Sequence, residues 1–327
     1  MEHITMSIKE IDRHSIIKKL VDKEINWPLA AKLLQLSVRQ TKRLKAGFVA
    51  LGAKALIHQS RGKPSNRRMP ETERITIVRI LKEKYPDFKP TFASEKLFEN
   101  HHIKKDPKTI RQIMTQEGLW QPKKKKQKEY HAWRQRKECY GQMAQFDGSY
   151  HHWVENRGPE WCLLASIDDA TGIPVKAEFA AHEGVFPVFT FWKEYITTHG
   201  KPRAIYLDKF STYKMNQKVA IENHDTQTQF QRAMRQLGIE PISAHSPQAK
   251  GRIERLFNTF QDRLVKEMRL RNISTIEEAN LFLEEEFLPN YAKKYSVEPV
   301  SKTNLHQPLS KKEISNLDSV FSKQTER

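Results

Sequence analysis

The chain has 327 residues, enough for about two domains with hydrophobic cores of their own, which excludes a small disulfide-stapled scaffold. It carries 57 Lys and Arg against 39 Asp and Glu, a formal net charge of +18, which predicts a polyanionic partner. Residues 1–130 hold 30 basic and 14 acidic residues, whereas residues 131–327 hold 27 and 25, so almost all of the excess positive charge is N-terminal.

Cysteine usage and apolar runs bear on location. The two cysteines, Cys139 and Cys162, come without a secretory signal and indicate reduced thiols. The longest apolar runs, near Trp161–Ile167, fall far short of the roughly 18 residues of a membrane span. We therefore expect a soluble, cytoplasmic protein with no membrane partner.

Residues 1–60 have the apolar spacing of three short helices between Ser15 and Leu44. The spacing is that of a helix-turn-helix, and Ser37 is placed to cap the last helix. We expect that helix to read a DNA major groove with its outward-facing side chains, Arg39, Gln40, Lys42 and Arg43. An ordinary helical hairpin with a solvated basic face is the alternative.

Residues 61–70 are rich in glycine, proline, serine and arginine and predict a linker, because such a composition cannot form a packed core. Its basic residues are expected to contact DNA phosphates; they are Arg61, Lys63, Arg67 and Arg68. Residues 71–120 predict a second helical DNA-binding unit. Asp106 and Pro107 suit the N-cap and first turn of its last helix, on which Lys108 and Arg111 are candidate DNA contacts.

Residues 121–140 predict a basic linker, after which the pattern changes from helical to β. Residues 141–273 begin with short β-branched and aromatic runs separated by turn signals, including Gly148-Ser149, and continue with alternating helices and strands. This order predicts a mixed α/β sheet flanked by helices, and residues 274–327 predict a C-terminal helix and polar tail. The expected strands are Met143–Phe146, His151–Val154, Trp161–Ile167, Ile173–Ala180, Ala204–Leu207 and Ile239–Ser243, and the expected helices are Phe186–Thr198, Gln227–Leu237 and Arg252–Met268.

Three acidic residues fall where a phosphoryl-transfer site requires them. Asp147 and Asp208 each close a predicted strand, and Glu254 lies in the first turn of a long helix, at its buried end beside the sheet. Two divalent cations need shared carboxylate oxygens, and Mg²⁺ takes one or two carboxylates together with phosphate and water. Any single one of these acids is ordinarily structural, so the prediction depends on their joint order of strand, strand and helix.

Other charged residues surround these acids in the sequence. Asp168 and Asp169 lie in a turn with Thr171 and Gly172, so we assign both to hairpin geometry. Four basic residues close to the acids along the chain are candidate DNA contacts: Lys209, Lys250, Arg252 and Arg255.

Four segments resemble the integrase core of DDE transposases, most closely the ISNCY group of bacterial insertion-sequence transposases. They are Gln145–Ser149, Ser166–Gly172, Leu207–Lys209 and Ser246–Arg255, and the last is the most specific. The resemblance spans about Ser15–Pro299. It implies an RNase H-like fold, two Mg²⁺ or Mn²⁺ ions, and catalytic, metal-binding roles for the three acids Asp147, Asp208 and Glu254.

The resemblance further implies a transposase that binds the terminal repeats of its element and cuts and joins DNA strands. Its partners would be double-stranded DNA, both element ends and target, and further copies of the chain on that DNA. The 45 residues between Asp208 and Glu254 exceed the spacing in retroviral integrases. Members of the group usually continue into a small β-rich domain beyond the position of Arg327.

Two other functions stay open. A non-catalytic, shortened copy would bind DNA as a repressor of transposition. A nuclease on the same RNase H-like fold would hydrolyse DNA without joining ends, although such an enzyme has less use for tandem N-terminal DNA-binding units.

Overall fold

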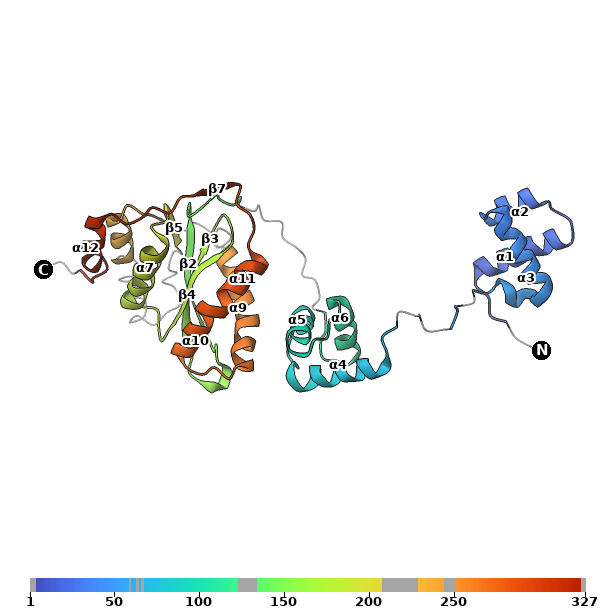
Figure 1. Cartoon of the computed structure of the whole chain (residues 1–327), viewed down its shortest axis with the longest axis horizontal. Helices are drawn as coiled ribbons and strands as arrows, with labels where there is room; N and C mark the ends of the chain where they lie inside the picture. Colours follow the sequence, from blue (N-terminus) through green and yellow to red (C-terminus); the bar gives the residue numbers. More distant parts are fainter. Residues whose placement is uncertain are drawn as a thin grey trace.

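The computed structural model describes residues 4–58, 60–62, 65, 68–122, 134–207, 229–243 and 251–324. Along the chain, Figure 1 shows a helical unit formed by α1–α3, a second formed by α4–α6, and an α/β core. The helices of the two units are α1 (Ile8–Val21), α2 (Trp27–Leu34), α3 (Val38–Leu51), the 3₁₀ helix η1 (Gly52–Leu56), α4 (Glu71–Lys84), α5 (Pro90–His101) and α6 (Pro107–Gln116).

The first unit confirms the expected helices, and its turns follow from local chemistry. The Asn26 side chain accepts a hydrogen bond from the Leu29 amide at 3.0 Å and caps α2. Gln35 ends α2 in a left-handed conformation, with φ of 53°. Ser37 then caps α3, since its Oγ accepts a hydrogen bond from the Gln40 amide at 3.2 Å. The helices pack around buried Ile17, Leu20, Ala30 and Leu56.

The second unit has its own core and a sequence-encoded helix start. The Asp106 carboxylate accepts a hydrogen bond from the Lys108 amide at 2.7 Å, and Pro107 occupies the first turn of α6, both as expected. Fully or nearly fully buried side chains from all three helices form the core, among them Leu81, Phe92, Leu97, Ile110 and Met114.

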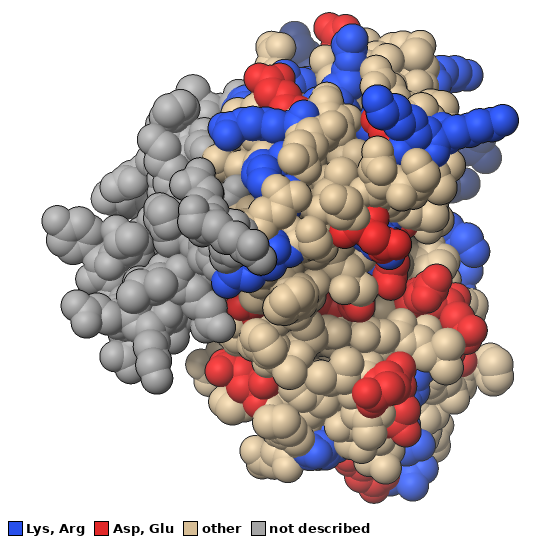
Figure 2. Space-filling model, turned by 90° about the vertical axis from the view of Figure 1, so that its left-hand side faces the viewer, with Lys and Arg blue, Asp and Glu red and all other residues tan. Residues whose placement is uncertain are grey.

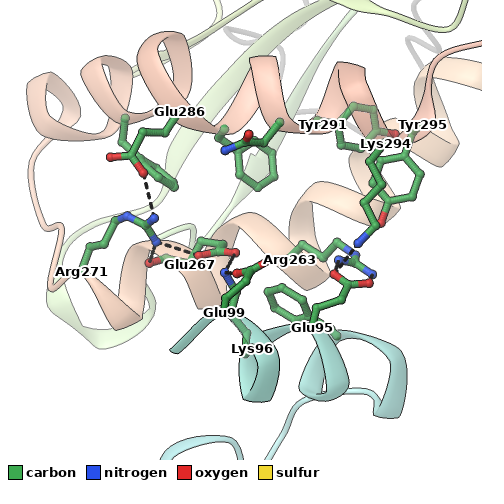
Figure 3. Close-up of a pocket in the computed structure, with 14 residues that line it drawn as sticks. Glu95, Lys96, Glu99, Arg263, Glu267, Arg271, Glu286, Tyr291, Lys294 and Tyr295 are labelled. Carbon is green, nitrogen blue, oxygen red and sulfur yellow. Dashed lines mark hydrogen bonds and ion pairs between the residues drawn. The ribbon is translucent and has the colours of Figure 1, made fainter. Parts of the chain in front are cut away.

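The second unit contacts the α/β core through α5 and the loop before it. Figure 3 shows Glu95 and Lys96 of α5 facing Arg263 and Glu267, which lie on helix α9 (Gly251–Leu270). Glu95 accepts hydrogen bonds from both Arg263 Nη1 and Nη2, at 2.5 and 3.2 Å, while Lys96 pairs with Glu267. Further ion pairs join Asp87 to Arg269 and Lys89 to Asp262. The contact is therefore dominated by paired charges.

The described strands of the core form a mixed sheet in the order β4-β3-β2-β5-β6. Strands β2, β3 and β4 are antiparallel, whereas β5 pairs parallel with both β2 and β6. A short parallel pair, β1 with β7, lies at one end of the core. The strands are β1 (Cys139–Tyr140), β2 (Ala144–His151), β3 (Trp161–Asp168), β4 (Pro174–Ala180), β5 (Ala204–Leu207), β6 (Glu240–Ser243) and β7 (Ser301–Asn304).

Helices cover both faces of this sheet (Figure 1). Helix α7 (Val185–His199) packs on the face that carries Phe146 and Leu164. The other face carries Leu163, Ala165 and Ile167, and α9 packs on it together with α10 (Ile276–Phe282). Successive side chains along β3 therefore point to opposite faces of the sheet, as the period of two in a strand requires.

Two expectations for the first strands were wrong. Gly148 and Ser149 do not form a turn but continue β2, which runs on to His151. A Cβ at Gly148 would lie 2.5 Å from Glu183 Oε2 and 3.1 Å from Cys162 Sγ, so this glycine serves a close approach between segments. Residues 151–154 do not form a strand of their own; Trp153 and Val154 instead lead into the 3₁₀ helix η2 (Glu155–Arg157).

The C-terminal segment also differs from the expected helix and polar tail. After α10 come the π-helical turn η4 (Leu283–Phe287), α11 (Leu288–Tyr295), β7 and α12 (Lys311–Val320). Leu317 of α12 and Phe321 are buried against the α7 face of the sheet. The segment is therefore part of the core. Among the described residues, no helix is long and apolar enough to cross a membrane.

Candidate active site

Asp147 lies in the middle of β2, on the face of the sheet that α9 covers. Asp147 lies directly opposite Ala165 of β3, and the Ala165 side chain packs with the buried residues of α9. Because directly opposed residues share a face of the sheet, Asp147 faces α9 as well. Its carboxylate is half-buried, and Oδ1 accepts a hydrogen bond from the Gly148 amide at 3.1 Å. The expectation that Asp147 ends a strand was therefore wrong, because β2 continues for four residues beyond it.

Glu254 lies in the first turn of α9, as expected, but it is exposed and not buried. The buried stripe of this helix is formed by its neighbours Ile253, Leu256, Phe257 and Phe260. Glu254 and Gln261 are seven residues apart and so share one side of the helix, two turns from each other. Gln261 donates a hydrogen bond from Nε2 to Ser149 Oγ at 3.2 Å, which turns this side of α9 toward β2.

Helix α9 runs alongside β2 in matched register. The Ile253 amide donates a hydrogen bond to Gln145 Oε1 at 3.2 Å, and eight residues later Gln261 contacts Ser149. Four strand residues rise about 13 Å and eight helical residues about 12 Å, so the two contacts fix the elements side by side. Asp147 lies midway between Gln145 and Ser149 on the same face. Asp147 and the first turn of α9 therefore flank the same stretch of the sheet.

The third predicted acid, Asp208, lies outside the described residues, as do Lys209, Lys250, Lys63 and Arg67. The strand before it, β5, is parallel to β2 and pairs Tyr206 with Gln145. Among the described residues, no three His, Cys, Asp or Glu side chains gather closely enough to hold a metal ion.

The structure separates the roles of Asp168 and Asp169. Asp168 accepts hydrogen bonds from the Thr171 amide and hydroxyl at 2.8 and 2.7 Å, which agrees with its assignment to the turn. Asp169 is fully buried, and the hydrogen bonds to its carboxylate come from outside that turn. Its backbone lies in the turn, as expected, but its side-chain partners lie on β2, on α9 and on the segment before β1, so hairpin geometry does not account for its carboxylate.

Several predicted DNA contacts are exposed, as a binding role requires. On α3, Arg39, Gln40, Lys42 and Arg43 all face solvent, and Lys42 Nζ lies 5.8 Å from the ring centre of Trp27. Of the other predicted contacts, Arg68, Lys108, Arg111 and Arg255 are also exposed. The Arg111 guanidinium lies 5.7 Å from the Trp120 ring centre.

Two predicted DNA contacts, Arg61 and Arg252, hydrogen-bond to buried carboxylates. Arg61 pairs with the buried Glu10 of α1 and donates a hydrogen bond to the Thr5 carbonyl at 3.0 Å, which joins the linker to the first unit. Arg252 donates a hydrogen bond to Asp169 at 2.7 Å, so its guanidinium is directed into the protein and not toward solvent.

Glu183 is a charged residue beside β2 that the sequence did not reveal, and it lies on the α7 face of the sheet, opposite to the face of Asp147. Its carboxylate lies against Gly148, the residue after Asp147, and its amide donates a hydrogen bond to the Tyr150 hydroxyl at 2.7 Å. Burial, followed by the nearby Glu183 carboxylate, raises the pKa of Cys162. This thiol therefore stays protonated and unreactive. The sequence around Glu183 does not predict this contact, because Glu183 and β2 are far apart along the chain and come together only in the folded structure.

The chain is similar to two bacterial proteins over most of its length. It is 39% identical over 307 residues to "Putative transposase y4bF" of Sinorhizobium fredii, which covers 94% of this chain and 66% of that protein. It is 30% identical over 315 residues to the transposase for insertion sequence IS1202 of Streptococcus pneumoniae, covering 84% of this chain and 66% of that one. The chain thus spans just under two thirds of the length of each. No family model matches it.

Among solved structures, the chain resembles two assemblies of viral integrases at low overall similarity. One is a simian T-cell lymphotropic virus intasome, with 14% identity, 66% of this chain and 80% of that chain covered, and a TM-score of 0.37. The other is the HTLV-2 integrase catalytic core domain, with 16% identity, 45% and 89% coverage, and a TM-score of 0.30.

Proposed function

We propose that the chain is a DNA transposase of the DDE type, with an RNase H-like catalytic core. The observation that carries the proposal is the register of α9 with β2, which brings Glu254 and Asp147 to the same face of the sheet. Its similarity to transposases supports this class. The motif Ser246–Arg255 supports the finer placement in the ISNCY group.

The donor set fits a divalent cation. Asp147 and Glu254 offer carboxylate oxygens, the ligands that Mg²⁺ and Mn²⁺ prefer, from a strand and a helix that are held in register. Asp208 follows β5, the parallel neighbour of β2, and is the proposed third ligand. Two bound ions would supply charge stabilisation at the attacked phosphate and at the leaving oxygen.

The protein's own groups have distinct tasks in this reaction. Asp147 is proposed to hold both ions, with Asp208 and Glu254 each completing one. The rigid pairing of β2 with β3 fixes Asp147, because the two strands pair along the whole length of β2. The Gln145 contact to the Ile253 amide fixes the start of the helix that carries Glu254. Arg255, exposed beside Glu254, is placed to contact a DNA phosphate.

DNA recognition is assigned to the two helical units. Exposed basic side chains on α3 and α6 suit major-groove and phosphate contacts, in a helix-turn-helix manner for α1–α3. Figure 2 shows basic and acidic side chains interspersed on one face of the α/β core, with lysine and arginine gathered toward its upper edge. This mixture agrees with the near balance of 27 basic and 25 acidic residues in residues 131–327. Several copies of the chain are proposed to assemble on the DNA.

The test is a reaction of the whole chain with a duplex carrying the element end, under single-turnover conditions. The proposal expects strand cleavage and joining to target DNA with Mg²⁺ or Mn²⁺, and binding with little chemistry in Ca²⁺, which tolerates looser coordination. Cleavage without joining would favour a nuclease. Specific binding without either reaction in any of the three metals would favour a repressor.

A further inference from the structure

The Asp169 carboxylate is a junction between three segments of the core. It is fully buried and accepts hydrogen bonds at Oδ1 from Gln145 Nε2 and from Arg252 Nη1, both at 2.7 Å. Arg134 also pairs with Oδ1, and the Lys137 amide donates to Oδ2 at 2.9 Å. Three of these donors converge on Oδ1 and one binds Oδ2, so the carboxylate is engaged by protein groups at both oxygens.

Two of the residues that donate to Asp169 lie close in sequence to the proposed metal ligands. Gln145 is two residues before Asp147 on the same face of β2, and Arg252 is two residues before Glu254 at the start of α9. The Gln145 side chain also connects β2 to α9 directly. Its Nε2 donates a hydrogen bond to Asp169, and its Oε1 accepts one from the Ile253 backbone amide. One of the otherwise unpaired amides of the first turn of α9 is thereby satisfied.

The charge balance makes the junction specific for a carboxylate. Arg252 and Arg134 bring two guanidinium groups to one acid, and Arg252 Nη2 also donates to the Arg134 carbonyl at 3.1 Å. An amide at position 169 would keep the shape but remove the charge, leaving two partly buried cations without a counterion. The start of α9 would then lose its ion pair with the residue that follows β3.

We propose that Asp169 is a positioning residue that sets the separation of Asp147 and Glu254. It acts through Gln145 and Arg252 and does not touch the metal or the DNA. Ligands that share two cations about 3.5 to 4 Å apart must be held to about 0.5 Å. The junction adds a charged contact to the two direct hydrogen bonds between α9 and β2. The inference rests on the proposed function, because it assumes that Asp147 and Glu254 bind metal.

The test is Mn²⁺ binding to the whole chain, titrated with the metal alone and followed by electron paramagnetic resonance, with melting temperature recorded for each variant. Asp169→Asn is compared with Asp168→Asn, which alters a neighbouring buried carboxylate whose hydrogen bonds come from Gly141 and Thr171 instead of Gln145 and Arg252. We expect Asp169→Asn to raise the Kd for Mn²⁺ about tenfold and Asp168→Asn to leave it within about twofold. Arg252→Lys keeps the positive charge but loses the second guanidinium donor, so its Kd for Mn²⁺ should lie between those of the two variants.

Asp147→Asn separates the failure of this inference from the failure of the proposed function. If Asp147→Asn weakens Mn²⁺ binding but Asp169→Asn does not, Asp169 is not a positioning residue and the inference is overturned. Equal weakening by Asp168→Asn and Asp169→Asn would overturn it as well, since both would then act through stability. If Asp147→Asn leaves Mn²⁺ binding unchanged, the proposed metal site is wrong and the inference fails with it.

Discussion

Reversal of one charge at the contact between α5 and α9 should weaken the docking of the second helical unit on the core. Arg263 and Glu95 form a two-pronged ion pair in which the side chains are 15% and 21% exposed. Burial acts to raise the pKa of Glu95, but hydrogen bonds from Arg263 and Lys294 outweigh it and hold this pKa below its ordinary value. The pair therefore stabilises the docked arrangement shown in Figure 3.

The magnitude follows from the partial burial of the pair. Exposed pairs contribute about 0.2 to 1 kcal/mol, and the loss of one partner of a buried pair costs about 3 to 5 kcal/mol. Lys294 stays bound to Glu95 at 2.5 Å, which moderates the loss. We expect Arg263→Glu to cost about 2 kcal/mol, which shifts the docking equilibrium about 30-fold.

The assay is the distance between spin labels on Gln112 of α6 and Glu277 of α10, both exposed, measured by double electron–electron resonance. The wild-type chain should give one narrow distance, and Arg263→Glu a broader distribution that widens further with salt. The exchanged pair, Glu95→Arg with Arg263→Glu, should restore the narrow distance. A narrow distance in Arg263→Glu, or no recovery in the exchanged pair, would refute the reasoning.

Two further predictions concern DNA specificity and pH. Arg39→Ala and Arg43→Ala should each narrow the affinity gap between cognate and random duplex by about 1 to 3 kcal/mol at fixed salt, whereas Lys19→Ala, exposed on α1, should leave the gap unchanged. Burial, with the nearby His199, lowers the pKa of His306 to about 4. The unfolded chain, in which this pKa is about 6.5, then binds more protons between pH 4 and 6.5, so stability should fall as the pH falls through this window. His306→Gln should flatten that dependence in urea unfolding, and an unchanged slope would contradict the assigned pKa.

Features set by chemistry within a few residues could be predicted from the sequence. Ser37 and Asp106 cap their helices through hydrogen bonds that span three and two residues, so the residue types alone locate α3 and α6. The regular apolar stripe of α9 likewise predicts a long helix with Glu254 in its first turn. These elements fix much of the fold and one part of the candidate site.

Features set by contacts between distant segments could not be predicted in this way. Glycine at position 148 favours a turn, yet Gly148 lies within β2. The glycine is needed there because Glu183 and Cys162 approach too closely for a Cβ. Asp169 follows a true turn acid, Asp168, but its partners lie up to 83 residues away. Leu317 is the buried residue of α12, a helix of mostly polar residues. With so few apolar residues, the sequence of α12 does not predict that it packs on the core.

The measurement that tests the central claim most directly is single-turnover cleavage and joining on a short end duplex by Asp147→Asn, Asp208→Asn and Glu254→Gln. Each substitution keeps the side-chain shape but removes the charge needed to hold divalent cations against phosphate repulsion. We predict that each abolishes both reactions while end binding and melting temperature stay near those of the wild-type chain. Near-normal cleavage by Asp208→Asn, with an unchanged fold, would contradict the three-acid site.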